Sequence, residues 1–346
     1  MSGDKANILL VGSGGVGTIA SVGLEMSGKA SVTSVLRSDY DRVKERGFEI
    51  QSIDYGNFES WRPTHVEKSV QEAMDKHGPF DYILVATKVL PEIQPTEKLI
   101  QPAVTPRKSV IVLIQNGIGI EEPVANAFPE NIILSGVSMV SAHNYGGKVV
   151  EHEPDELIIG YFDSPGFEKD QLLQTAREFV ALYSAAGADC VLTEELNFTR
   201  WRKLVYNSTI NTTCALTRVD AGRSFHSGME QQLVVPAMRE IIAIAKSEGI
   251  TIPESAITDM VESDDGVYAT PSMQVDVEKG NPMELEVILG NPLRTARKNG
   301  VPTPILSVVY ELLKAVQFSL MERRGHIKLP KNGPTRSAGD VPYYKQ

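Results

Sequence analysis

A lysine and two asparagines recur at helical spacing in the second half of the chain. Lys203, Asn207 and Asn211 stand at positions i, i+4 and i+8, so on one helix they would share a face. The residues around them are mostly apolar, which is typical of a buried helix. Buried polar side chains need partners, and these could be protein groups, water or a ligand. The spacing leaves two interpretations open: a packed polar face whose lysine reaches the surface, or a functional site.

A glycine-rich motif near the start of the chain indicates a second kind of chemistry. The apolar stretch 6–11 predicts a buried parallel strand, and residues 18–26 have a helical pattern. Between them stand Gly12, Ser13, Gly14, Gly15, Val16 and Gly17, a G-x-G-x-x-G motif. The glycines permit a tight turn and the close approach of a pyrophosphate, which the helix N-terminus would face. We therefore predict a dinucleotide site; an ordinary glycine-rich turn is the alternative.

The end of the next predicted strand bears on which dinucleotide binds. Residues 31–36 form that strand, and Arg37 follows it. In this type of fold an acid at about this distance binds the ribose hydroxyls of NAD, whereas an arginine suits the 2′-phosphate of NADP. Arg37 therefore favours NADP, while Asp39, two residues later, would argue for NAD. A solvated loop charge is the remaining interpretation of Arg37.

Two further strands end in polar residues. The apolar stretches 81–86 and 108–114 are followed by Thr87 and Lys88 and by Gln115, Asn116 and Gly117. Ligands of open α/β sheets bind at the carboxyl ends of the strands, so we expect Thr87, Lys88 and Asn116 to border the nicotinamide half of the cofactor. The Asn116–Gly117 pair is equally typical of a simple turn.

The predicted elements divide the chain into two domains and a tail. Up to residue 195 strands alternate with helices, and we expect a loop at 55–64, a surface helix at 66–76 and strands at 132–140, 148–153 and 156–161 that extend one sheet. Beyond it the patterns are helical, notably at 197–216, 228–248 and 304–321. The predicted boundaries are 1–195 for a dinucleotide-binding domain, 196–325 for a helical substrate and catalytic domain, and 326–346 for a basic tail.

Charge and composition exclude several classes of partner. The net charge of the 346-residue chain is −10, which argues against general nucleic-acid or anionic-membrane binding. We find no signal peptide, no apolar run approaching the roughly 20 residues of a membrane span, and no histidine–cysteine cluster for a metal. These features favour a cytoplasmic protein without a disulfide framework, since only two cysteines occur. The amphipathic segment 228–248 could pair with a second copy, so a homodimer is possible.

The order of these motifs resembles that of the ketopantoate reductase family over nearly the whole chain up to about residue 322. The matching features, in order, are Gly12 to Gly17, Thr87–Lys88, Gln115–Asn116–Gly117, Lys203 with Asn207 and Asn211, Pro271–Ser272–Met273 with Asp276, Glu284, and the segment Gly300 to Pro304. The resemblance implies an N-terminal Rossmann domain, a C-terminal all-helical domain and an active site between them. It also implies NADPH-dependent reduction of 2-dehydropantoate to (R)-pantoate.

The resemblance assigns roles to individual residues. Lys203 matches the catalytic lysine, which would stabilise the charge on the substrate oxygen and donate a proton to it as a general acid. Glu284 matches the active-site glutamate, and Lys88 the lysine beside the cofactor. Asn116, Asn207 and Ser272 match substrate-binding positions, and Asn211 continues that face. Two alternatives are a homologous reductase of another 2-oxo acid or activated ketone, and a non-catalytic dinucleotide sensor.

Three positions depart from the family pattern. Leu289 replaces an asparagine that is common after the glutamate, and Met283 stands where a threonine is common before it. Ala269 precedes Ser272 by three residues, where some members have a substrate-binding asparagine. Because the lysine is present, we expect reductase chemistry to be retained and the three changes to bear on substrate specificity.

Overall fold

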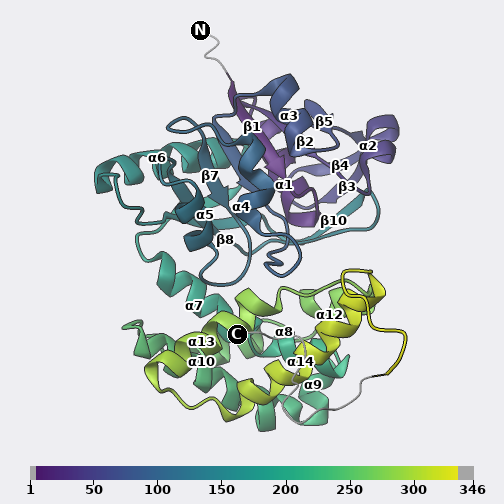
Figure 1. The fold of residues 1–346 in the computed structure, drawn as a ribbon, viewed down its shortest axis with the longest axis vertical. Helices are drawn as coiled ribbons and strands as arrows, with labels where there is room; N and C mark the ends of the chain where they lie inside the picture. Colours follow the sequence, from purple (N-terminus) through teal and green to yellow (C-terminus); the bar gives the residue numbers. More distant parts are fainter. Residues whose placement is uncertain (1–4, 334–346) are drawn as a thin grey trace.

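An α/β part and an all-helical part make up the molecule, as predicted. The computed structural model describes residues 5–333. Figure 1 shows the strands gathered in the upper part and the helices from α7 onward in the lower part. The predicted tail at 326–346 lies largely outside the described residues, and the boundary predicted at residue 195 stays a prediction.

An eight-stranded, mainly parallel sheet forms the centre of the upper part. Its strands are β1 (Ala6–Val11), β2 (Ala30–Val35), β5 (His65–Glu67), β6 (Tyr82–Val85), β7 (Val110–Leu113), β8 (Ile133–Ser138), β11 (Glu156–Tyr161) and β12 (Asp189–Leu192). Their order across the sheet is β12-β11-β8-β7-β6-β1-β2-β5. Only the pair β11 and β8 is antiparallel. The carboxyl ends of β1, β2, β6 and β7 therefore meet at one edge of the sheet, as the sequence predicted.

Both faces of this sheet are covered, which explains the uninterrupted apolar strands. Along β1, Ile8 and Leu10 belong to one core, and Leu9 and Val11 to the other. The helices connecting the strands are α1 (Gly15–Met26), α2 (Tyr40–Arg46), α3 (Val70–His77), α4 (Thr96–Ile100), α5 (Glu121–Ala127) and α6 (Lys169–Tyr183), with short turns η1 (Gln101–Ala103) and η2 (Ser184–Ala186).

A second, four-stranded sheet was not predicted. It contains β3 (Phe48–Ser52), β4 (Gly56–Trp61), β9 (Ser141–Asn144) and β10 (Lys148–Glu153), in the order β4-β3-β10-β9. The loop predicted at 55–64 is therefore wrong, since β4 is an edge strand paired with β3 and its polar residues face solvent. The assignment of 148–153 to the main sheet is also wrong. Likewise, the helix predicted at 66–76 begins only at Val70, because His65–Glu67 pairs with β2.

Helices make up the second half of the chain. They are α7 (Leu196–Asn207), α8 (Ile210–Thr217), α9 (Ala221–Ser227), α10 (Val235–Ser247), α11 (Ser255–Glu262), α12 (Ser272–Glu278), α13 (Asn291–Asn299) and α14 (Pro304–Arg323), with π-helical turns η3 (Glu230–Val234) and η4 (Glu286–Gly290). The single helix predicted at 197–216 is wrong, because it breaks between Asn207 and Ile210. Thr209 Oγ1 and Thr212 Oγ1 bond back to carbonyls one turn earlier, a contact that weakens and bends helices.

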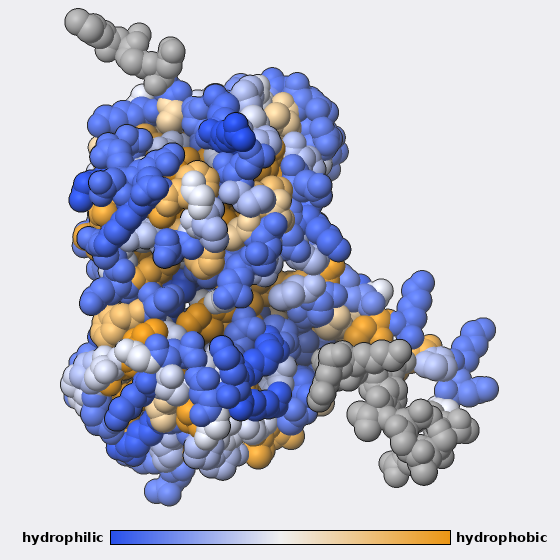
Figure 2. Space-filling model, turned by 60° about the vertical axis from the view of Figure 1, so that its left-hand side comes forward, coloured by the Kyte–Doolittle hydropathy of each residue, from blue (hydrophilic) through white to orange (hydrophobic). Residues whose placement is uncertain are grey.

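One hydrophobic core joins the two parts. It runs from Leu9, Val85 and Leu113 on the sheet to Trp201 on α7 and Leu313 on α14. Figure 2 shows hydrophobic residues along the waist where the two parts meet. Helix α7 packs against β8 and β11 of the sheet, and the ion pair between Lys88 and Asp276 links the segment after β6 to α12.

The last helix is longer and more apolar than the sequence analysis allowed for. The 20-residue α14 is long and apolar enough, by these measures alone, to cross a membrane. A core helix passes the same test, and α14 turns Leu306, Val309, Leu313 and Leu320 into the core shared with the sheet. Packing therefore explains the inward apolar side chains of α14, while Val308 and Leu312 on the same helix are more than half exposed.

Candidate active site

The glycine motif forms the turn between β1 and the N-terminus of α1. Gly12 has φ +108°, and a Cβ there would lie 2.4 Å from the backbone nitrogen of Thr87. A Cβ on Gly17 would lie 2.0 Å from the carbonyl oxygen of Gly12. Both positions therefore require glycine, for the turn and for the packing of helix on strand.

The residues of this loop fit a dinucleotide. Nothing lies within 4 Å of the position a Cβ on Gly14 would take, so the backbone there is open to a ligand. The hydroxyl of Ser13 is buried and has no hydrogen-bond partner among the described residues. Free amides at the start of α1, beside Gly15 and Val16, would bind the pyrophosphate, and a nicotinamide cofactor bound there supplies or accepts a hydride.

The two candidate ribose-binding residues differ in their partners. The Asp39 carboxylate accepts a hydrogen bond of 2.9 Å from the Asn144 amide, whose nitrogen also donates to the Ser13 carbonyl. Arg37 is exposed just after β2, and the one hydrogen bond it makes within the described part of the chain, to Gln94, is long at 3.5 Å. Arg37 is thus the freer of the two to meet a ligand.

Lys203 lies where α7 crosses the ends of β7 and β8. Its ammonium donates to Asn116 Oδ1 over 3.0 Å and to the carbonyl oxygen of Ser138. Burial, assisted by the positive charge of Arg200, lowers the pKa of Lys203 to about 8, while Glu284 acts in the opposite direction. The interpretation of Lys203 as a lysine that simply reaches the surface is therefore not what the structure shows.

Glu284 belongs to the same group of side chains through Asn116. Its Oε1 accepts a hydrogen bond of 2.8 Å from the backbone N–H of Val89. Burial raises the pKa of Glu284, and Lys88, Val89 and the Asn116 amide oppose that shift. Asn116 thus stands between Lys203 and Glu284, and the two ionisable groups have no direct ion pair in the described part of the chain.

The residues after β6 are also held in place. Gln115 donates to the backbone oxygen of Thr87 over 2.7 Å and to its hydroxyl over 3.1 Å. Lys88 forms an ion pair with Asp276 on α12, so the edge of the sheet is linked to the helical part. Asp276 was noted in the sequence only as part of a motif, and its pairing with Lys88 was not predicted.

Asn207 lies close to Lys203, while Asn211 has separate partners. A cavity of about 10 Å³ is lined by Asn116, Arg200, Lys203 and Asn207, among others. That volume holds about one water molecule, so a substrate needs these side chains to rearrange. Asn211 instead accepts from the backbone N–H of Met273 over 2.7 Å and donates to Ser272 over 3.1 Å. The predicted face is therefore divided by the break between α7 and α8.

Arg200 is a residue of the site that the sequence analysis missed. Its guanidinium is almost completely buried, pairs with Glu121 at 2.8 Å and donates to the carbonyl oxygens of Gln115 and Gly117. It also donates to the Ser135 hydroxyl. Arg200 therefore fixes the loop that carries Asn116. In the sequence, only the position of Arg200 three residues before Lys203, on the same helix face, indicated that it belongs to the site.

Two of the departures from the family pattern lie in the core. Met283 and Leu289 have no exposed surface and belong to the core that joins the two parts. Ala269 is partly buried, and its carbonyl oxygen accepts from the backbone N–H of Ala221. The first two replacements therefore affect packing, while Ala269 leaves a short side chain in the segment leading to Ser272.

Residues 5–333 contain no group of three or more histidine, cysteine, aspartate or glutamate side chains placed to hold a metal ion.

Comparison with known proteins gives consistent matches. The model "Ketopantoate reductase PanE/ApbA" matches residues 8–164, and the corresponding C-terminal model matches residues 195–317. An uncharacterized protein of Saccharomyces cerevisiae is 40% identical over 95% of this chain and 99% of its own. The structure of 2-dehydropantoate 2-reductase from Methylococcus capsulatus is 33% identical and covers 91% of this chain and 97% of its own, with a TM-score of 0.77.

A more distant structure shares the fold. It is the ternary structure of D-mandelate dehydrogenase with NADH and anilino(oxo)acetate, 21% identical, with a TM-score of 0.77, covering 91% of this chain and 99% of its own.

The Rossmann sheet with its glycine loop, the helical part and the lysine between them define an NAD(P)-dependent oxidoreductase. Within that class, the chain belongs to the ketopantoate reductase family.

Proposed function

We propose that this protein reduces 2-dehydropantoate to (R)-pantoate with NADPH, in the cytoplasm, as a step toward pantothenate. Lys203 is the general acid in this proposal, and Glu284 holds the Lys203 ammonium in place through Asn116. Asn116, Asn207 and Ser272 would bind the substrate. Asn211 positions Ser272 and the start of α12, since it hydrogen-bonds to Ser272 and Met273 of that helix.

The environment of Lys203 carries this proposal. An ammonium has three donors, and two of them are used by Asn116 and by the Ser138 carbonyl. The third is available for the carbonyl oxygen of a substrate, where negative charge develops as hydride arrives. With its pKa lowered to about 8, Lys203 is mostly protonated at neutral pH yet gives up its proton more readily than an exposed lysine.

The choice of NADPH over NADH is supported by the partners of Arg37 and Asp39. The carboxylate that would bind the ribose of NAD is engaged by Asn144, whereas the exposed guanidinium can turn toward a 2′-phosphate. The related D-mandelate dehydrogenase was solved with NADH, so preference within this fold must be measured for each protein.

The test is a substrate panel with both cofactors. Purified protein is given NADPH or NADH with 2-dehydropantoate, other 2-oxo acids or diketones, and cofactor oxidation is followed by absorbance. We expect 2-dehydropantoate with NADPH to give the highest kcat/KM. Fast turnover of another 2-oxo acid or ketone with negligible turnover of 2-dehydropantoate would replace the proposed substrate. Cofactor binding without reduction of any carbonyl would instead indicate a dinucleotide sensor.

A further inference from the structure

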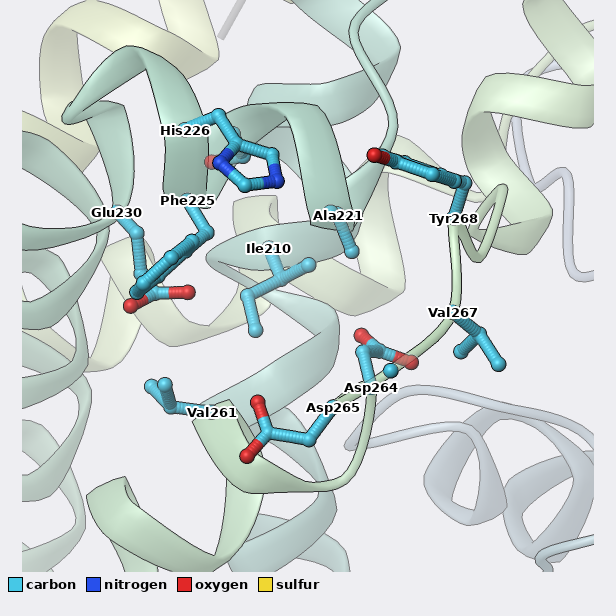
Figure 3. Close-up of a pocket in the computed structure, with 13 residues that line it drawn as sticks. Ile210, Ala221, Phe225, His226, Glu230, Val261, Asp264, Asp265, Val267 and Tyr268 are labelled. Carbon is cyan, nitrogen blue, oxygen red and sulfur yellow. The ribbon is translucent and has the colours of Figure 1, made fainter.

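The helical part contains a cavity that is much larger than the one beside Lys203. Its volume is about 300 Å³, at the lower end of the range for small-molecule sites. The lining residues that bear charge or an aromatic ring are Phe225, His226, Glu230, Asp264, Asp265 and Tyr268. Figure 3 shows these side chains arranged around one space, between α8, α9 and the segment after α11. No predicted site residue is among them.

Three carboxylates line this cavity, and no lysine or arginine does. In the described part of the chain, Glu230, Asp264 and Asp265 take part in no ion pair. Burial raises the pKa of Glu230, and the charges of Asp265 and Asp264 act in the same direction. The cavity therefore holds negative charges that repel one another, and Arg223, which contacts the Tyr268 ring, is paired with Asp220 outside the lining.

The hydrogen bonds of these acids leave acceptor positions free. Glu230 is only 7% exposed, and among residues 5–333 its carboxylate accepts one hydrogen bond, of 3.3 Å, from its neighbour Gln231 to Oε1. Asp264 accepts a bond of 2.6 Å from the Tyr206 hydroxyl. For Glu230 this leaves Oε2 without a recorded partner among the described residues, although the residue lines the cavity (Figure 3). This oxygen is not sealed within the protein, so a ligand in the cavity can donate a hydrogen bond to it.

Aromatic rings also line the cavity. Phe225 and Tyr268 are 59% and 61% exposed, which is high for large side chains, and His226 lies between them (Figure 3). The ring of Tyr268 already attracts one cation, since the Arg223 guanidinium lies 4.7 Å from its centroid. Aromatic faces and carboxylates together form the usual surroundings of organic cations.

From these observations we infer that this cavity binds a small organic cation, with an ammonium or guanidinium group facing Glu230, Asp264 and Asp265 and an apolar body against Phe225 and Tyr268. A metal ion is a poorer match, because the described residues contain no group of three or more side chains in ligating positions. An anionic 2-oxo acid is repelled by the same charges.

This cavity adjoins the segments that carry Asn211 and Ala269, through Ile210 and Tyr268, but Lys203 and Asn207 are not among its lining residues. It shares no lining residue with the cavity around Lys203 and Asn207. The inference therefore does not depend on the proposed reaction, and binding should persist in a Lys203→Ala variant that has lost turnover.

The experiment uses benzylamine as the probe and benzyl alcohol as its uncharged counterpart. Isothermal titration calorimetry at pH 7.5 measures the Kd of each for the full chain. We expect benzylamine to bind at least about tenfold more tightly than the alcohol, because one charge–charge contact at a partly buried site contributes that much or more. Lys203→Ala should leave the Kd of benzylamine unchanged.

Variants locate the binding. Asp265→Asn should weaken benzylamine binding by about 3- to 10-fold and Tyr268→Ala by a similar factor. Asp265 is exposed, so its variant should fold normally; Glu230→Gln provides a second variant on the buried side. Asp189→Asn, an exposed acid on β12, is the matched control and should have no effect. Equal binding of amine and alcohol, no saturable binding, or a Kd unchanged in both carboxylate variants would overturn the inference.

Discussion

Lys203 places a charged hydrogen-bond donor in a largely buried site. Its ammonium is held by two oxygen acceptors, and burial brings its pKa to about 8. A general acid must be protonated to act, so activity should depend on pH where this group titrates.

The first prediction concerns this pH dependence. As pH rises through about 8, Lys203 loses its proton, and kcat/KM for carbonyl reduction should fall. Lys203→Met should lower kcat by roughly 10²–10⁴ and remove this alkaline limb, while NADPH still binds. Steady-state rates between pH 6 and 9.5 measure both effects. Lys108→Met, at a half-exposed lysine paired with Asp81, is the control. An alkaline limb that persists in Lys203→Met would exclude this lysine as the group that titrates.

Arg37 carries the second prediction at this scale. Its loss should raise the KM for NADPH by about tenfold or more, since a hydrogen bond to a charged group contributes about 1.5–3 kcal/mol. The KM for NADH should be nearly unchanged in Arg37→Ala. Arg46→Ala, an exposed arginine on α2 that contacts Glu45, should affect neither cofactor. Equal effects of Arg37→Ala on both cofactors would mean that the guanidinium does not contact a 2′-phosphate.

Helix α7 positions the site through a residue that does no chemistry itself. Arg200 ties α7 to the Gln115–Gly117 loop and to Glu121 on α5. Because both partners of that ion pair are almost completely buried, removal of one leaves an uncompensated charge.

The third prediction follows for stability. Arg200→Met should lower the free energy of unfolding by about 3–5 kcal/mol, as expected when one partner of a buried ion pair is removed. Arg202→Met, two residues later, breaks a half-exposed pair with Asp259 and should cost at most about 1 kcal/mol. Urea denaturation of both variants gives the comparison. Equal losses would show that the Arg200–Glu121 pair does not anchor α7.

A fourth prediction separates two roles for Asn211. Pro271 precedes α12 and has no side-chain acceptor, so Asn211 Oδ1 caps this helix from α8. Asn211→Ala should therefore cost about 0.5–2 kcal/mol of stability, the value of a lost cap. If Asn211 instead bound substrate directly, KM would rise while the thermal midpoint stayed unchanged. Thermal unfolding and kinetics on the same preparation distinguish these cases.

The elements that the sequence predicted are those with local signals. The strand–glycine–helix unit at 6–26 and the strands before Thr87 and Gln115 follow from apolar runs ended by glycine or polar residues. Strand β4 could not be predicted, since an edge strand with polar side chains looks like a loop. The break in 197–216 was also hidden, because hydroxyl bonds to the previous turn leave no mark in the hydrophobic pattern.

The site could be predicted only in part for a similar reason. Lys203 and the glycine loop have recognisable spacing, but the partners of Arg200 come from three distant segments. Asn116 and Glu284 are 168 positions apart in the sequence (284 − 116), and only the fold brings them together. The family resemblance supplied their roles before any geometry could.

At the scale of the whole molecule, the shared core connects the two parts mechanically. The hydrophobic cluster that covers one face of the sheet continues through α7, α10 and α14. The ion pair between Lys88 and Asp276 crosses the same boundary. Two domains joined by a free linker would each have a core of their own. Here the α/β part, which has the glycine loop, and the helical part, which has Lys203, share one core. Whether two copies associate stays a prediction, and measurement of the solution mass decides it.

The last prediction is that the two parts unfold together. The chain has two tryptophans, and each reports on one part: Trp61 on β4 and Trp201, which is almost fully buried, on α7. Trp61→Phe and Trp201→Phe leave one fluorescent probe each. Because one hydrophobic core contains side chains of both parts, such as Leu113 on β7 and Trp201 on α7, we expect both urea transitions to have the same midpoint and slope. Urea unfolding of each variant followed by circular dichroism shows whether the substitution itself shifts the midpoint. Two separated midpoints would mean that the common core is too weak to couple the sheet to the helices, and that the lysine and the cofactor loop belong to independently folding domains.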